Sequence, residues 1–137
     1  METITHSAEQ TKKLALSLAK KLKGGDIVAL YGDLGSGKTT FVQGLVKGFG
    51  IRDTVRSPTF VFIRFYGKKL KIVHIDLYRI NSLDELEDLG LEEFWGGKDT
   101  ICLIEWPERM ENALPKGALK IGFSYISESE RRISGNL

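Results

Sequence analysis

The octapeptide from Gly32 to Thr39 constrains the fold of this chain more than any other segment. Its letters, GDLGSGKT, match the pattern G-x-x-x-x-G-K-[ST] at every fixed position. The preceding run, 26–31, is short, apolar and rich in β-formers, and the following run, 39–49, has helical spacing and ends before Gly50. Because strand, glycine-rich loop and helix are the context that this motif requires, the segment predicts a phosphate-binding loop.

Each residue type in the octapeptide has a chemical reason. A phosphate needs several hydrogen-bond donors from one side, and inward-turned backbone N–H groups and a helix N-terminus supply them. Lys38 would place a mobile positive charge on the β- and γ-phosphates, and the Thr39 hydroxyl would be a hard oxygen ligand for Mg²⁺. The chain has no N-K-x-D motif, so guanine specificity is unsupported. The sequence therefore predicts a site for ATP with magnesium.

The remaining periodic segments favour an α/β fold. Capping boxes at 7–10 and 82–85 predict a first helix that ends at Gly24-Gly25 and a short acidic helix towards Leu89. Further strands are predicted over 60–66, 70–77, 100–105 and 118–126 and in the last residues. The first two of these are joined by a hairpin turn at 67–69. We expect one domain over 1–137, a P-loop NTPase-like three-layer sandwich with a mixed parallel and antiparallel sheet.

Composition and charge narrow the class of protein. The 137 residues are 42% hydrophobic and 28% charged, which suits one globular core, and the net charge of +2 gives no strong pull towards nucleic acid or membranes. The single cysteine, Cys102, cannot form an internal disulfide and is expected to be a small buried hydrophobe. Without an apolar leader or a membrane-length apolar run, we expect a cytoplasmic protein with no membrane contact.

Two carboxylates end apolar runs that we expect to be strands. The run 71–76 ends in Asp76, and the run 101–105, which is less interrupted and more typical of a central strand, ends in Glu105. A P-loop NTPase needs such a carboxylate for its magnesium shell. We expect Glu105 to reach Mg²⁺, directly or through water, and Asp76 to support that shell or to order the attacking water. The alternative for each is an ordinary acid that faces solvent.

Three further features have two interpretations each. The interval 56–60 is where NTPases often carry a switch, whose threonine, here Thr59, senses the γ-phosphate; the alternative is a plain turn at Pro58. His74 alternates with apolar residues and is expected on the strand surface rather than as a catalytic base. Trp106 is expected to pack at a corner, with a platform beside the nucleotide as the alternative.

Four segments together resemble the bacterial TsaE (YjeE) family. They are GDLGSGKTTF at 32–41, SPTF at 57–60, HIDLYR at 74–79 and IEWPE at 104–108, in this order over nearly the whole chain. The P-loop alone identifies a superfamily, whereas the HxDxYR and IEWPE segments are much more specific. The resemblance implies a magnesium-dependent ATPase, weak alone, that is required for threonylcarbamoyladenosine at position 37 of tRNAs reading ANN codons. It also implies that the protein works with TsaD and TsaB.

The resemblance further implies roles for individual residues. The implied nucleotide-binding residues are Thr11, Gly35, Ser36, Gly37, Lys38, Thr39, Thr40 and Trp106. The implied catalytic residues are Lys38, Thr59, Asp76 and Glu105, and the implied magnesium ligands are Thr39 and Glu105. The family's late arginine near the nucleotide corresponds to Arg131 or Arg132, and the match in this segment is too loose to choose between them. We take Arg132 as the predicted nucleotide-binding residue.

Three functions compete on the sequence alone. The first is an ATPase subunit of a tRNA-modifying machine, and the second is a nucleotide-gated interaction module in which hydrolysis is incidental. The two acids argue for hydrolysis. The third, a small-molecule phosphotransferase, needs a lid with several arginines, and after residue 105 the chain has only Arg109, Arg131 and Arg132. Lysine clusters near 12–23 and 68–71 could contact tRNA directly, and the sequence does not decide whether they do. The sequence also does not give the oligomeric state.

Overall fold

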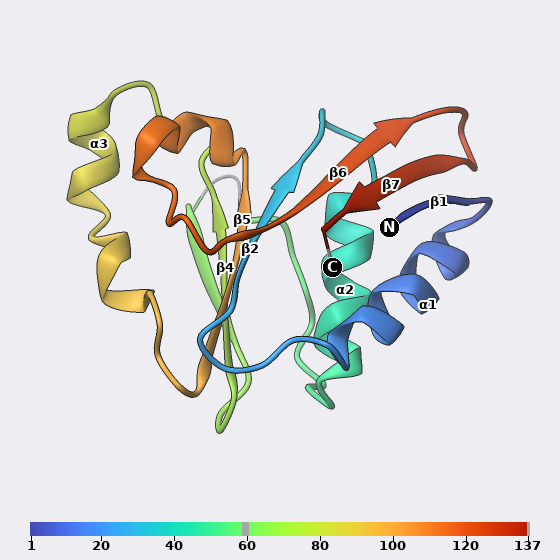
Figure 1. The fold of residues 1–137 in the computed structure, drawn as a ribbon, viewed down its shortest axis with the longest axis horizontal. Helices are drawn as coiled ribbons and strands as arrows, with labels where there is room; N and C mark the ends of the chain where they lie inside the picture. Colours follow the sequence, from blue (N-terminus) through green and yellow to red (C-terminus); the bar gives the residue numbers. More distant parts are fainter. Residues whose placement is uncertain (59–60, 137) are drawn as a thin grey trace.

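A seven-stranded sheet lies between two layers of helices in the computed structural model, which describes residues 1–58 and 61–136 (Figure 1). The strands are β1 (Glu2–Thr5), β2 (Ile27–Tyr31), β3 (Ile63–Tyr66), β4 (Lys71–Asp76), β5 (Thr100–Glu105), β6 (Leu119–Tyr125) and β7 (Arg131–Gly135). The α-helices are α1 (Ala8–Ala19), α2 (Lys38–Gly48) and α3 (Leu83–Asp88), and the 3₁₀ helices are η1 (Leu91–Phe94) and η2 (Pro107–Ala113). The predicted three layers are therefore present.

The order of the strands is β1-β7-β6-β2-β5-β4-β3, with a parallel centre and antiparallel edges. The pairs β2–β5, β2–β6 and β4–β5 are parallel, whereas β3, β7 and β1 join by antiparallel pairing. This arrangement confirms the predicted α/β fold with a mixed sheet. Because the carboxyl ends of parallel strands meet at one edge, Glu105 is in register with Leu30 on β2 and with Asp76 on β4.

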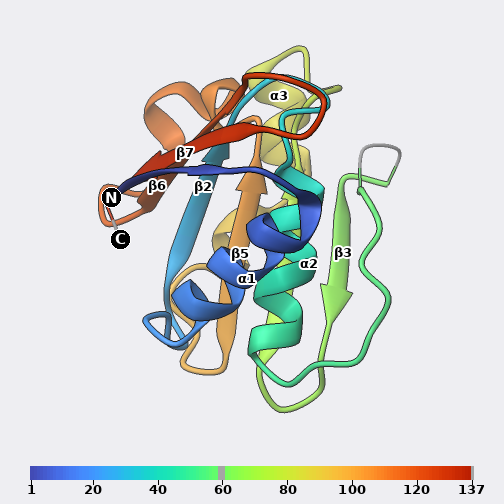
Figure 2. The same cartoon turned by 90° about the vertical axis from the view of Figure 1, so that its right-hand side faces the viewer.

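Each face of the sheet has its own apolar core. Helices α1 and α2 lie together on one face, as Figure 2 shows, and bury Phe41 and Leu45 against the sheet. Gly44 lets the two helices approach closely, because a Cβ there would lie 2.5 Å from the Lys12 carbonyl oxygen. Helix α3 and the 3₁₀ helices cover the other face with a second cluster that includes Leu86 and Met110.

The structure differs from the sequence expectation at short elements. Strand β1 was not predicted, because four residues paired only to the edge of β7 give too short a pattern to read. Strand β3 begins at Ile63 rather than at 60: the Pro58 carbonyl accepts hydrogen bonds from the Val61 and Phe62 amides at 3.0 and 2.7 Å, so a turn precedes the strand. The helices among the described residues include none with the length and apolarity of a membrane span.

Candidate functional site

The octapeptide forms the loop between β2 and α2, as predicted. Gly32, Gly35 and Gly37 have φ angles of 151°, 75° and 104°, which are values that glycine adopts readily and other residues rarely adopt. A Cβ on Gly32 would lie 2.6 Å from Ser36 Oγ and 2.8 Å from the Phe123 carbonyl oxygen. The loop conformation therefore depends on these glycines.

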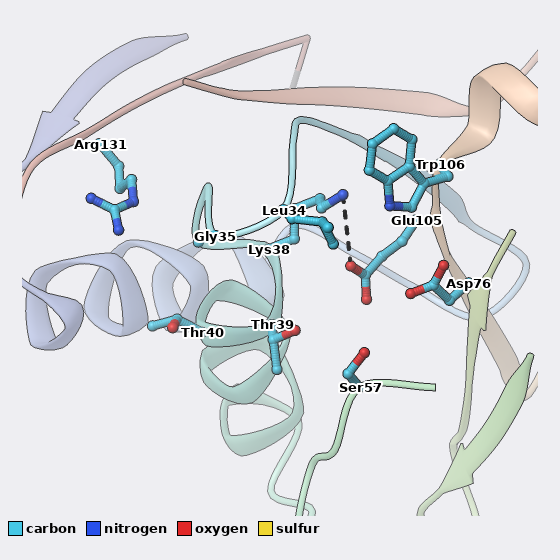
Figure 3. A pocket seen from close by; sticks show the side chains of 11 residues that line it. Leu34, Gly35, Lys38, Thr39, Thr40, Ser57, Asp76, Glu105, Trp106 and Arg131 are labelled. Atoms are coloured by element: carbon cyan, nitrogen blue, oxygen red, sulfur yellow. Dashed lines mark ion pairs between the residues drawn. The ribbon is translucent and has the colours of Figure 1, made fainter. Parts of the chain in front are cut away.

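A cavity of about 220 Å³ opens at the N-terminus of α2 (Figure 3). Among the described side chains none caps this helix end, so its first amide groups are available to an anionic ligand. The lining residues are Leu34, Gly35, Gly37, Lys38, Thr39, Thr40, Ser57, Asp76, Glu105, Trp106 and Arg131. Most of the residues that the sequence predicted for the site thus meet in one cavity.

Lys38, the first residue of α2, is the buried cation of this cavity. Only 5% of the residue is exposed, and its Nζ donates a hydrogen bond to the Gly32 carbonyl oxygen at 2.5 Å. The same Nζ lies 3.9 Å from Glu105 Oε1 and 4.4 Å from the centroid of the Trp106 ring. Burial lowers the pKa of Lys38, against the opposing effect of the Glu105 and Asp76 carboxylates. A triphosphate would add negative charge beside this buried ammonium.

The two strand-end carboxylates lie side by side opposite Lys38. Asp76 and Glu105 are paired in register at the ends of β4 and β5, and each is 3% exposed. Asp76 Oδ1 accepts a hydrogen bond from the Tyr78 amide at 2.8 Å. Neither acid faces bulk solvent, so the alternative of ordinary surface acids is wrong. Their burial at the cavity wall is costly unless a cation or a hydrogen-bond donor compensates it.

His74 is buried, and the expectation that it lies on the strand surface is wrong. It is 0% exposed, and its Nε2 lies 2.6 Å from Glu105 Oε2. The reason is that β4 is an interior strand with helices on both faces, so alternation along it separates two buried faces rather than a buried face from a wet one. The sequence signal that could have revealed this was the unbroken apolar character of the residues around it.

Trp106 packs at a corner, as expected, and also lines the cavity, while its role beside a nucleotide stays a prediction. Its backbone has φ 59° and ψ 48°, a left-handed conformation that is unusual for a bulky residue, at the start of η2. Its ring packs at 4.9 Å from the Tyr78 ring and also lines the cavity over Lys38. The strained turn thus directs the indole from the corner into the site.

The arginine at the cavity is Arg131, not the Arg132 of the predicted set. Arg131 lines the cavity beside Gly37, whereas Arg132, the next residue of β7, is half exposed and has its Nε 4.0 Å from Glu2. Adjacent residues of a strand point to opposite faces, which explains why only one of them reaches the site. The Arg131 Nη1 is held by the Ser127, Glu128 and Glu130 carbonyl oxygens.

Three other predicted residues lie beside or outside this cavity. Thr11 is buried and lines a neighbouring cavity of about 80 Å³, whose wall also includes Gly37, Thr40 and Arg131. Ser36 is buried in the loop and is not among the described lining residues of the main cavity. Thr59 lies outside the described residues, although Ser57 of the same interval lines the cavity.

The donor set fits a magnesium ion that is shared with a nucleotide. The Thr39 hydroxyl and the Glu105 and Asp76 carboxylates are hard oxygen donors that line the same cavity. Within 1–58 and 61–136, no cluster of three His, Cys, Asp or Glu side chains could hold a metal by itself.

Comparisons with known proteins agree with one another. Residues 5–133 match the family model of threonylcarbamoyl adenosine biosynthesis protein TsaE. The tRNA threonylcarbamoyladenosine biosynthesis proteins TsaE of Bacillus subtilis and Treponema pallidum are 43% and 35% identical to this chain; the alignments cover 95% and 98% of it and 81% and 98% of those proteins. The crystal structure of Bacillus subtilis YdiB superimposes with a TM-score of 0.83 at 35% identity, over 98% of this chain and 83% of that one. The chain therefore belongs to the TsaE family of tRNA threonylcarbamoyladenosine biosynthesis proteins.

Proposed function

We propose that this protein binds ATP with Mg²⁺ and hydrolyses it in the service of threonylcarbamoyladenosine modification at position 37 of tRNAs reading ANN codons. The observation that carries the proposal is the cavity that joins a complete P-loop to two buried carboxylates from neighbouring parallel strands. A phosphate-binding loop alone would suit many ligands. The opposing carboxylates are what a magnesium-dependent hydrolase needs in addition.

The proposed roles follow from the positions of the groups. The loop amides and Lys38 neutralise the β- and γ-phosphates, and Trp106 covers the Lys38 ammonium and limits its hydration. Thr39 and Glu105 would hold the magnesium ion, which when bound polarises the phosphates and offsets the charge of the leaving group. Asp76, beside Glu105, is placed to accept a hydrogen bond from a water that approaches the γ-phosphate.

We further propose that the protein is cytoplasmic and acts with the TsaD and TsaB subunits. The isolated chain should hydrolyse ATP slowly, because Arg131 is the one arginine among the described lining residues and its Nη1 is already engaged by three carbonyl oxygens. A partner that closes over the cavity would exclude water and could supply a further charge for the transition state. Hydrolysis would then reset the assembly between rounds of modification.

The competing proposal is a nucleotide-gated interaction module in which hydrolysis is incidental. The burial of Asp76 and Glu105 favours hydrolysis, because binding of the phosphates alone does not need two desolvated acids. A small-molecule phosphotransferase is the least supported function, because Arg131 is the one arginine among the described lining residues.

The deciding experiment measures ATP binding and phosphate release by the purified protein, alone and with TsaD and TsaB. We expect magnesium-dependent binding, slow release alone and faster release in the assembly. The control is Lys47→Ala, which removes an exposed lysine from the far end of α2. If calorimetry detects no nucleotide binding, the proposal fails; if binding supports repeated tRNA modification without hydrolysis, the module is correct.

A further inference from the structure

A row of hydrogen-bonded polar groups begins at the Glu105 carboxylate, the proposed magnesium ligand, and crosses β4 and β3. His74 Nε2 lies 2.6 Å from Glu105 Oε2, and His74 Nδ1 lies 3.2 Å from the Tyr66 hydroxyl oxygen. That hydroxyl accepts a hydrogen bond from the Arg56 amide at 3.2 Å, and its single hydrogen is shared between the Arg56 carbonyl oxygen at 2.9 Å and His74 Nδ1. The row therefore connects Glu105 on β5 to the segment before Pro58, through β4 and β3.

The position of His74 is one where packing alone would favour an apolar residue. His74 is 0% exposed and shares its sheet face with Ile72, Leu103 and Ile101, which are all buried hydrophobic residues. A buried imidazole adds a desolvation cost that an aliphatic side chain would not have, and it is tolerated because both of its nitrogens have partners. Stability of the core does not account for a histidine here.

The contact with Glu105 fixes one oxygen of that carboxylate. An ionised carboxylate only accepts hydrogen bonds, so His74 Nε2 carries the hydrogen that Glu105 Oε2 receives. The other oxygen, Oε1, is left towards Lys38 at 3.9 Å, on the side of the cavity. Groups that orient a metal-binding carboxylate in this way commonly change metal affinity or activity by about 10–100-fold when they are removed.

The other end of the row reaches the segment that borders the cavity. Both backbone groups of Arg56 are bound to the Tyr66 hydroxyl, and the next residue, Ser57, lines the cavity. A displacement of this segment would break or lengthen hydrogen bonds that continue, through one phenol and one imidazole, to Glu105. The geometry thus gives one physical link between the segment and the carboxylate.

We infer that His74 is a positioning residue that orients Glu105 for the magnesium ion and, through Tyr66, couples that orientation to the Arg56–Ser57 segment. The inference rests on the proposed function, because it gives Glu105 its role beside the nucleotide. It also makes a separate prediction about His74. The environment of Nε2 should change when magnesium binds at Glu105, and that of Nδ1 should change when the Tyr66 hydroxyl is removed.

The first test is kinetic and uses a matched pair of variants. His74→Leu fills the space and removes the hydrogen bond to Glu105, so we expect kcat to fall about 10–100-fold and the half-saturating Mg²⁺ concentration to rise, with ATP binding in EDTA within about twofold of wild type. His74→Gln keeps an N–H donor near the Nε2 position and should recover most of kcat. Folding of both variants is checked by melting temperature and circular dichroism. A folded His74→Leu protein with unchanged kcat and magnesium dependence overturns the inference.

The second test is spectroscopic and does not depend on turnover. The chain has two histidines, and His6 is exposed, so a ¹⁵N-imidazole spectrum has few signals and His6→Asn assigns them. We expect Mg²⁺ with a non-hydrolysable ATP analogue to shift the His74 nitrogens in wild type but not in Glu105→Gln, and Tyr66→Phe to shift Nδ1 without nucleotide.

The outcomes of the two tests separate the inference from the function on which it rests. A wild-type protein that binds the analogue but releases no phosphate contradicts the proposed ATPase, while the His74 signals still decide the inference. Signals of His74 that ignore both magnesium and Tyr66→Phe overturn the inference even if the ATPase is active.

Discussion

Strands β4 and β5 present polar residues of the candidate site on one face of the sheet and apolar core residues on the other. On the face towards α2, the residues near the strand ends are His74, Asp76 and Glu105, all buried and polar. On the face towards α3 the matching strands present Val73, Ile75, Cys102 and Ile104, which belong to an apolar cluster. A period of two along each strand is what separates them.

The difference shows how a small chain can contain both a stable core and an electrostatically costly site. The apolar face gains free energy from burial, at about 25 cal/mol per Å². On the polar face, one lysine and two acids are buried at the carboxyl ends of the strands. Their burial costs free energy that a bound ligand and metal would offset. Variants on the two faces should therefore fail in different ways, one in activity and the other in stability.

The largest expected effect is that of Lys38→Ala on hydrolysis. Removing this charge should lower kcat/KM for ATP by about 10²–10³-fold, because in the proposed function Lys38 neutralises the phosphates from inside the P-loop. The melting temperature should change little, because the substitution removes the desolvation cost of the ammonium together with its attraction to Glu105 and Asp76 and its hydrogen bond to the Gly32 carbonyl oxygen. Phosphate release and thermal unfolding are measured on the same preparation, with Lys47→Ala as the control. A large loss of stability in Lys38→Ala would contradict the assignment of separate tasks to the two faces.

Glu105→Gln should reduce phosphate release by about 10²-fold, with a smaller loss in nucleotide binding. The amide keeps the volume of the side chain and an acceptor for His74, but it loses the charge that would hold the metal. The measurement is single-turnover hydrolysis at several Mg²⁺ concentrations. Asp76→Asn is the comparison variant on the neighbouring strand, and wild-type rates in Glu105→Gln would refute its proposed role.

The sequence predicted correctly the features that have a local motif or a long apolar run, and it missed those that depend on contacts between distant segments. The P-loop, the mixed sheet and the strand-end acids rest on local motifs or long apolar runs, and the structure has them where they were expected. The burial of His74 was missed, because it depends on β4 being an interior strand, and the apolar residues around His74 were a weak local signal of that position. The choice of Arg131 over Arg132 depends on the register of β7, which one strand's sequence does not set.

Ile75→Val tests the apolar face with a smaller expected effect. Ile75 is 0% exposed in the cluster under α3, and the loss of one methylene there should lower the free energy of unfolding by about 1 kcal/mol. The ATPase rate per folded molecule should stay within about twofold of wild type, because the side chain points away from the cavity. Urea unfolding and the hydrolysis assay provide the two numbers. A rate loss like that of Glu105→Gln would show that the faces are mechanically coupled rather than independent.

The smallest expected effect is that of alkylation at Cys102, which lies on the apolar face of β5. The thiol is 1% exposed, its Sγ donates to the Phe94 carbonyl oxygen at 3.4 Å, and burial raises its pKa to about 12. Only the thiolate reacts, and at pH 8.5 its fraction is roughly three orders of magnitude smaller than in an unfolded chain, whose thiol has a pKa near 8.5. Treatment of the native protein with iodoacetamide at this pH should leave both mass and ATPase rate unchanged over an hour, whereas in urea the mass should increase by one adduct. Rapid alkylation of the native protein would mean that the apolar face opens far more often than its packing allows.

The same thiol predicts a dependence of stability on pH. Because the folded thiol keeps its proton, the thiol favours the folded state most at pH values below 8.5. That contribution declines as the pH rises from there towards 12, so wild type should lose stability relative to Cys102→Ala over this interval.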